Sequence, residues 1–131
     1  MSQMNFLAVL VAAVSSFLLG GLWYSPALFG KTWQREAGDT RKPGDGHPAK
    51  VFGVSFLFAL IAALAYAALI PAPSTALQAA MQGLALGAGV VAASFGINYQ
   101  FANRSTKLLL IDGGYHTAQF GIYGLVLGLW R

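Results

Sequence analysis

The stretch that decides the fold is the last hydrophobic segment, residues 107–131, which reads KLLLIDGGYHTAQFGIYGLVLGLWR. It carries a single acidic residue, Asp112, and a single histidine, His116. At 100° per residue on a helix, five polar or aromatic side chains fall within an arc of about 100°. They are Asp112, Tyr115, His116, Gln119 and Tyr123. The segment is therefore predicted to be an apolar helix with one polar stripe.

The composition indicates a protein whose solvent is lipid. The chain of 131 residues is 56% hydrophobic and 9% charged, whereas a soluble domain usually carries about 25% charged residues. It contains no cysteine, which excludes a disulfide framework and a thiolate metal site. The basic residues lie between apolar segments, so the net charge of +4 is explained by membrane topology and not by nucleic-acid binding.

Four stretches are long and apolar enough to cross a membrane, which takes about 20 residues per helix. They cover about residues 4–24, 50–70, 75–101 and 107–130. The first lacks the basic start of a secretory signal and is expected to be retained. A four-residue turn at Pro71–Ser74 places the second and third helices antiparallel. The sequence thus predicts an all-α membrane protein, one domain over residues 1–131, with four transmembrane helices in an antiparallel bundle.

A short interfacial helix is predicted after the first span. Ser25 is suited to cap it, Pro26 to occupy its first position, and Gly38 to end it. Phe29, Trp33 and Ala37 recur four residues apart, which is typical of an amphipathic helix lying in the membrane surface. A plain loop with aromatic anchors is the alternative. The predicted anchors at the interface are Trp23, Tyr24 and Trp33.

The polar loop at about residues 31–49 determines the predicted topology. The connection between the first two spans, Lys50 included, and the turn up to Lys107 after the third span hold seven of the eight Lys and Arg residues. Basic loops stay in the cytoplasm, so both termini are predicted to lie outside it. Asp39 and Asp45 superficially suggest a calcium loop, but the alternating oxygen ligands and the closing Glu are absent. A solvated loop is the preferred interpretation.

Small residues at four-residue spacing predict close helix packing in lipid. Ala79, Gly83 and Gly87 form such a row in the third span, and Gly124 and Gly128 form another in the fourth. The second row lies off the polar stripe, toward another helix. Since so small a chain could not enclose a wide path alone, a homo-oligomer in the lipid bilayer is expected.

Two segments resemble a known family of small membrane proteins, domain of unknown function 1761. They are GLWYSPALFGKTW at residues 21–33, and NYQF at residues 98–101 followed by LLLIDGGYH at residues 108–116. The resemblance covers nearly the whole chain, with the central loop and second span similar only in character. It implies a four-helix integral membrane protein, mostly bacterial, and supplies no activity, cofactor or catalytic residue.

The polar stripe predicts a pocket facing the cytoplasm. An ionisable side chain at the centre of a membrane helix costs about 3 kcal/mol, so each needs a compensating partner. His116 lies about 13.5 Å beyond Lys107 along the helix, and its spacing from Asp112 permits a direct contact. The predicted lining is Asn98, Asp112, Tyr115, His116 and Gln119, with Trp23 and Tyr24 at the mouth.

Three functions remain open on the sequence. The ionisable stripe favours a channel or transporter-like protein that handles a proton or small polar solute. The alternative is a structural or accessory subunit of a membrane complex, because such polar bonds also join helices, at about 0.6 kcal/mol each. A membrane-embedded enzyme acting on a lipophilic substrate ranks last, since no nucleophile elbow or cofactor motif is present. Without a second intramembrane ligand beside His116, no metal or cofactor is expected.

Overall fold

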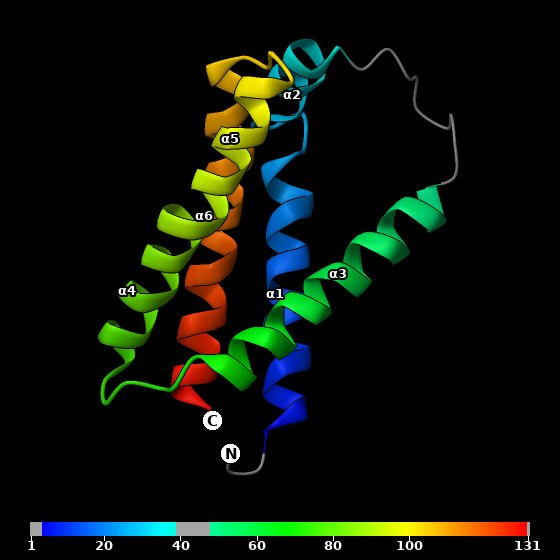
Figure 1. Cartoon of the computed structure of the whole chain (residues 1–131). Helices are drawn as coiled ribbons and strands as arrows, with labels where there is room; N and C mark the ends of the chain where they lie inside the picture. Colours follow the sequence, from blue (N-terminus) through cyan, green and yellow to red (C-terminus); the bar gives the residue numbers. More distant parts are fainter. Residues whose placement is uncertain (1–3, 39–47, 131) are drawn as a thin grey trace.

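The computed structural model describes residues 4–38 and 48–130, and this part of the chain is helical throughout, joined by turns (Figure 1). The predicted all-α class is confirmed. Residues 39–47, which hold the rejected calcium loop, lie outside the described residues. The elements are α1 (Phe6–Trp23), α2 (Gly30–Ala37), α3 (Pro48–Leu69), α4 (Ala76–Leu86), the π-helical segment η1 (Gly87–Ala92), α5 (Ala93–Phe101) and α6 (Thr106–Leu129).

Three helices among the described residues are long and apolar enough to cross a membrane, and they indicate a membrane protein. They are Phe6–Trp23, Ala49–Leu69 and Ala76–Phe101, the last formed by α4, η1 and α5 together. These three match three of the four predicted spans. Helix α6 has the necessary length, 24 residues, but its polar stripe makes it less apolar than the other three.

Helix α2 begins four residues later than predicted. The Ser25 hydroxyl donates to the Leu22 carbonyl at 2.7 Å and caps no helix, and the chain instead turns over residues 24–29. The Gly30 amide closes this turn on the Ser25 carbonyl at 2.9 Å. A Cβ atom at Gly30 would lie 2.8 Å from that same oxygen, so the turn requires glycine. The end at Gly38 is as predicted, with a left-handed φ of 68°.

Helix α6 lies at the centre of the molecule and packs closely against α4 and η1 (Figure 1). A Cβ atom at Gly83 would collide with the Phe120 carbonyl, and one at Gly124 with the Ala79 carbonyl. The two rows of small residues therefore meet each other within one chain, where they allow backbone to approach backbone. The face of α6 that carries Gly124 and Gly128, predicted to pack against another helix, is covered by α4 of the same chain.

Helix α1 runs antiparallel to α6, and the Asn5 side chain donates to the Trp130 carbonyl at 2.7 Å. The described ends of the chain consequently lie at the same end of the molecule (Figure 1). Ala12 and Val9 of α1, with Tyr123 and Leu127 of α6, form the centre of the buried core.

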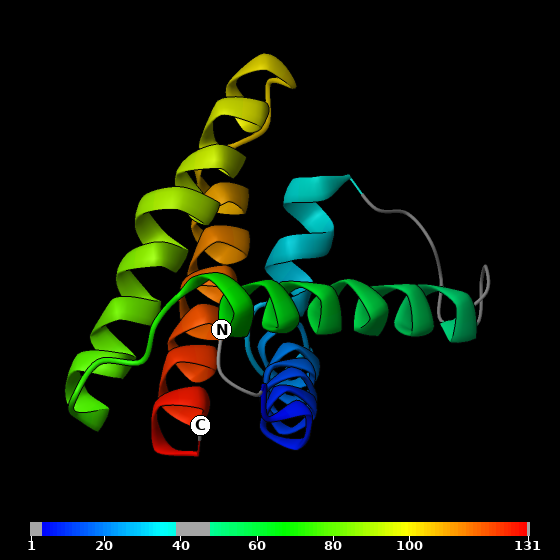
Figure 2. The ribbon, with the colours of Figure 1, turned by 60° about the horizontal axis from the view of Figure 1, so that its bottom comes forward.

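Helix α3 departs from the predicted antiparallel bundle, which is not confirmed. Figures 1 and 2 show it crossing α1 obliquely instead of lying alongside it. Its buried residues, Ala59, Ala63 and Tyr66, all belong to its second half. Residues 49–55 of its first half are exposed. The second half of α3 is thus buried, and its more exposed first half contacts α1 through Phe52 and Phe56, whose rings lie edge-on to Phe17.

The close approach at η1 predicts a sharp contrast between two neighbouring glycines. A Cβ atom on Gly87 would lie 2.6 Å from the Cα atom of Thr117, whereas one on Gly89 meets nothing within 4 Å. Overpacking of this kind costs about 1–3 kcal/mol. Gly87→Ala should therefore lower the midpoint of thermal unfolding in mild detergent, and the matched Gly89→Ala should not. Equal midpoints for the two variants would contradict the observed helix approach.

Candidate functional site

The carboxylate of Asp112 joins four helical elements. It is 8% exposed. One oxygen, Oδ1, accepts hydrogen bonds from the Tyr24 hydroxyl at 2.7 Å and the Trp33 indole at 3.1 Å. The other, Oδ2, accepts from the Tyr99 hydroxyl. Residues from the end of α1, from α2 and from α5 thus converge on one side chain of α6, and both carboxylate oxygens have donors.

The donors to Asp112 are neutral groups. Burial, followed by the hydrogen bond to Asp112, raises the pKa of the Tyr24 hydroxyl, so this group keeps its proton at physiological pH. The Trp33 indole is a donor only, and its ring packs edge-on against Tyr24 at 6.1 Å between ring centres. Hydrogen bonds to an ionised acceptor are the stronger kind, and here they replace the hydration that the carboxylate loses.

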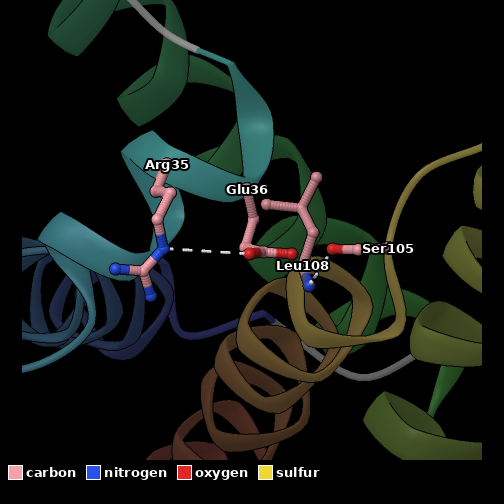
Figure 3. Close-up of polar contacts among 4 residues, drawn as sticks. All are labelled: Arg35, Glu36, Ser105 and Leu108. Atoms are coloured by element: carbon pink, nitrogen blue, oxygen red, sulfur yellow. Dashed lines mark hydrogen bonds and ion pairs between the residues drawn. The ribbon is translucent and has the colours of Figure 1, made fainter.

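Helix α2 is held over the first turn of α6, which positions Trp33. The Arg104 guanidinium donates to the Ala37 carbonyl at 3.0 Å, at the end of α2. Figure 3 shows Glu36 pointing toward the start of α6, where the Ser105 hydroxyl caps the Leu108 amide at 3.1 Å. A carboxylate at a helix N-terminus is favourable by about 0.3–1 kcal/mol. The exposed Arg35–Glu36 ion pair, at 3.9 Å, adds little.

A second polar chain begins at His116. Its Nδ1 lies 2.5 Å from the Gln119 side-chain oxygen, and the Gln119 amide nitrogen donates to the Tyr123 hydroxyl at 2.7 Å. That hydroxyl donates to the backbone carbonyl of Ala59 in α3 at 2.9 Å. The His116 ring is stacked on Phe95, with ring centres 4.8 Å apart. The two polar chains are separate, because His116 bonds to Gln119 and not to Asp112.

A cavity of about 960 Å³ lies between α1, the oblique α3 and α6. Its polar wall comes from Tyr24, Trp33, Asp112, Tyr115, His116 and Gln119, all named from the sequence. Most of the remaining lining is apolar, and it includes Phe17, Val51, Phe52, Phe58, Ala59, Ala62, Val91, Phe95 and Phe120. Lys31 and Gln34 of α2 lie at its edge and are exposed. The volume falls at the upper end of the range of about 300–1,000 Å³ for small-molecule sites.

Two predicted residues are not brought to this cavity. Asn98 is exposed on α5, and the adjacent Tyr99 reaches Asp112 in its place. Trp23 instead donates to the Ile111 carbonyl at 3.0 Å and packs against Phe29. Tyr99, one residue further along α5, lies at the level of Asp112. The side of α5 on which Asn98 lies could not be predicted from the sequence, because the π-helical segment η1 widens the helix just before α5 and changes which side chains face α6.

The sequence interpretation did not identify Tyr99 as a site residue. A phenol next to an amide near the end of a span is an ordinary interface anchor, so the signal was ambiguous. Tyr123 belonged to the stripe but was not named for the site, and it proves to connect Gln119 to α3. Each residue has a hydroxyl partner on another helix, Asp112 of α6 for Tyr99 and Ala59 of α3 for Tyr123.

The chain belongs to the family described as protein of unknown function (DUF1761), whose model matches residues 7–128. The resemblance drawn from the two sequence segments is thereby confirmed. Neither the comparison with curated proteins nor the comparison with solved structures gives a match. The family adds no activity, so the function must be argued from the cavity and its wall.

The convergence on Asp112 predicts energetic coupling between Asp112 and Tyr99. Tyr99→Phe removes the donor of the hydrogen bond between these two side chains, and Asp112→Asn changes its acceptor. The double variant should therefore lose less stability than the sum of the single variants. Contacting pairs of this kind couple by about 0.5–3 kcal/mol. The measurement is reversible unfolding in mixed micelles. Asp112→Asn with Ser94→Ala serves as the control pair, because Ser94 bonds only to the Val90 carbonyl and should be additive. Additivity in both pairs would contradict the Asp112 contacts.

Proposed function

We propose that this protein is a transporter-like membrane protein that binds a small organic molecule in the cavity between α1, α3 and α6. The observation that carries the proposal is the cavity itself. Its volume of about 960 Å³ is large for a gap left by interhelical packing, and the polar stripe of α6 forms one wall. Polar groups on an otherwise apolar wall are the usual composition of a small-molecule site.

A molecule is favoured over a proton as the solute. A proton path along α6 would need a hydrogen-bonded link between Asp112 and His116, and their bonds run to different partners. In this proposal Asp112 fixes the helices around the cavity, and His116 and Tyr115 are the groups that meet the bound molecule. The exposed first half of α3 forms the side through which the molecule enters from the bilayer.

The proposed topology has α6 as a fourth span in a bacterial inner membrane. Helix α2 and the start of α6 then lie at the cytoplasmic surface, where Lys31, Arg35, Arg104 and Lys107 gather. This places both termini on the other side and makes α2 the interfacial helix. Helix α6 can cross the membrane in this topology because neighbouring helices cover its polar stripe. The edge of the cavity at Lys31 then lies at the cytoplasmic end.

An accessory subunit is the second candidate function. The hydrogen bonds of Asp112 favour an accessory subunit, because a carboxylate with donors on both oxygens connects helices to one another. In that case the protein would be recovered in a larger complex or homo-oligomer after mild extraction. The cavity would then be filled by lipid without selectivity.

Two glycines give a matched test of the proposed function. A Cβ atom at Gly21 or at Gly53 meets nothing within 4 Å, but only Gly21 lines the cavity. Gly21→Phe should place a ring inside the cavity, and Gly53→Phe should place the same ring outside it. Native mass spectrometry of protein released from membranes should show a bound organic molecule in the parent and in Gly53→Phe, reduced about tenfold or more in Gly21→Phe, a loss of about 1.4 kcal/mol.

The same experiment decides between the two candidates. An identical mixture of ordinary membrane lipids on all three proteins would contradict the binding function and favour the accessory subunit. Thermal unfolding of both variants serves as the folding control, because neither ring is expected to displace existing atoms.

A further inference from the structure

We propose that His116 presents an unprotonated Nε2 to the cavity, and that the bound molecule is a lipophilic compound with a hydroxyl group that donates a hydrogen bond to it. This rests on the proposed binding function and specifies its ligand class.

The hydrogen-bond chain begins at a group that cannot donate a hydrogen bond. The backbone carbonyl of Ala59 is an acceptor only, so the Tyr123 hydroxyl, 2.9 Å away, gives its one hydrogen to it. The Tyr123 oxygen can then only accept from Gln119. The Gln119 group that faces it at 2.7 Å must therefore be the amide nitrogen, because a carbonyl there would leave two acceptors in contact.

This orientation of Gln119 determines the tautomer of His116. With the amide nitrogen on Tyr123, the Gln119 carbonyl oxygen faces Nδ1 of His116 at 2.5 Å, and Nδ1 must carry the hydrogen. A neutral imidazole has one protonated nitrogen, so Nε2 keeps its lone pair. Nε2 makes no hydrogen bond to any residue that the structure describes, and the ring lines the cavity. The stacked Phe95 holds the ring in this orientation.

A hydrogen-bond acceptor such as Nε2 on an apolar wall favours a ligand that carries a hydrogen-bond donor. The carboxylate of Asp112, the other strong acceptor on the wall, already has donors on both oxygens. An ammonium ligand in the cavity would lie near the positive charge of Lys31 at its edge and would find no free carboxylate. A neutral hydroxyl on an apolar body satisfies Nε2 and leaves the aromatic walls in contact with hydrocarbon.

The tautomer is tested by ¹⁵N NMR of imidazole-labelled protein in lipid nanodiscs, in a His47→Gln background that leaves His116 as the only histidine. The expected spectrum at neutral pH has a protonated Nδ1 and a bare Nε2. Gln119→Leu should remove this preference, whereas Gln100→Leu, the same change at an exposed position of α5, should leave it intact. An Nε2-protonated tautomer or a doubly protonated ring in the parent would overturn the proposal.

The ligand class is tested with dodecanol and dodecyl methyl ether, which share an apolar body and differ in the hydroxyl donor. Dodecanol should shift the His116 Nε2 signal and bind about tenfold tighter than the ether, the effect of one hydrogen bond. Gln119→Leu should reduce this preference. Equal binding of the two probes would overturn the hydroxyl assignment alone. Failure of both probes to bind, with Gly21→Phe indistinguishable from the parent, would overturn the binding function itself.

Discussion

A carboxylate in a largely apolar helix is the constraint on which this structure depends. Asp112 cannot be left unpaired in such surroundings, because an ionised group without donors is costly in a medium of low dielectric constant. Tyr24, Trp33 and Tyr99 supply these donors from three other segments. Trp33 comes within reach because the chain turns after α1 and α2 lies over the start of α6. The tight turn at Gly30 allows this placement of α2.

On the opposite face of α6, the helices are held together by close backbone contact and not by polar side chains. Gly83 and Gly124 remove side chains where the backbones of α4 and α6 approach, so these helices are fixed by close packing. Helix α3 is buried through Ala63 and Tyr66 in its second half and is bonded there through Tyr123 to Ala59. Its first half is more exposed and contacts α1 through the rings of Phe52 and Phe56, which lie edge-on to Phe17. The cavity lies beside this more exposed half of α3.

Much of the candidate site follows from helical periodicity. The stripe from Asp112 to Gln119 was expected on one face of the last helix, and four of its members line the same cavity. Periodicity was insufficient where the helix is irregular. The π-helical turn at Gly87–Ala92 lies between the predicted row of small residues and Asn98, so the face of α5 could not be extrapolated. The direct contact between Asp112 and His116 that their spacing permits is absent, because both side chains form hydrogen bonds to other residues.

The sequence by itself determined the class of protein and the position of its polar groups along the chain. Few charges, long apolar segments and the spacing of Asp112, Tyr115, His116 and Gln119 are local properties, and helical geometry converts them directly into spans and a stripe. Only the tertiary structure decided which partners these groups have. Tyr24 and Tyr99 meet Asp112, and Tyr123 meets Ala59, through contacts between residues distant in the chain. Such pairings depend on how helices cross and turn against one another, which periodicity along a single helix does not specify.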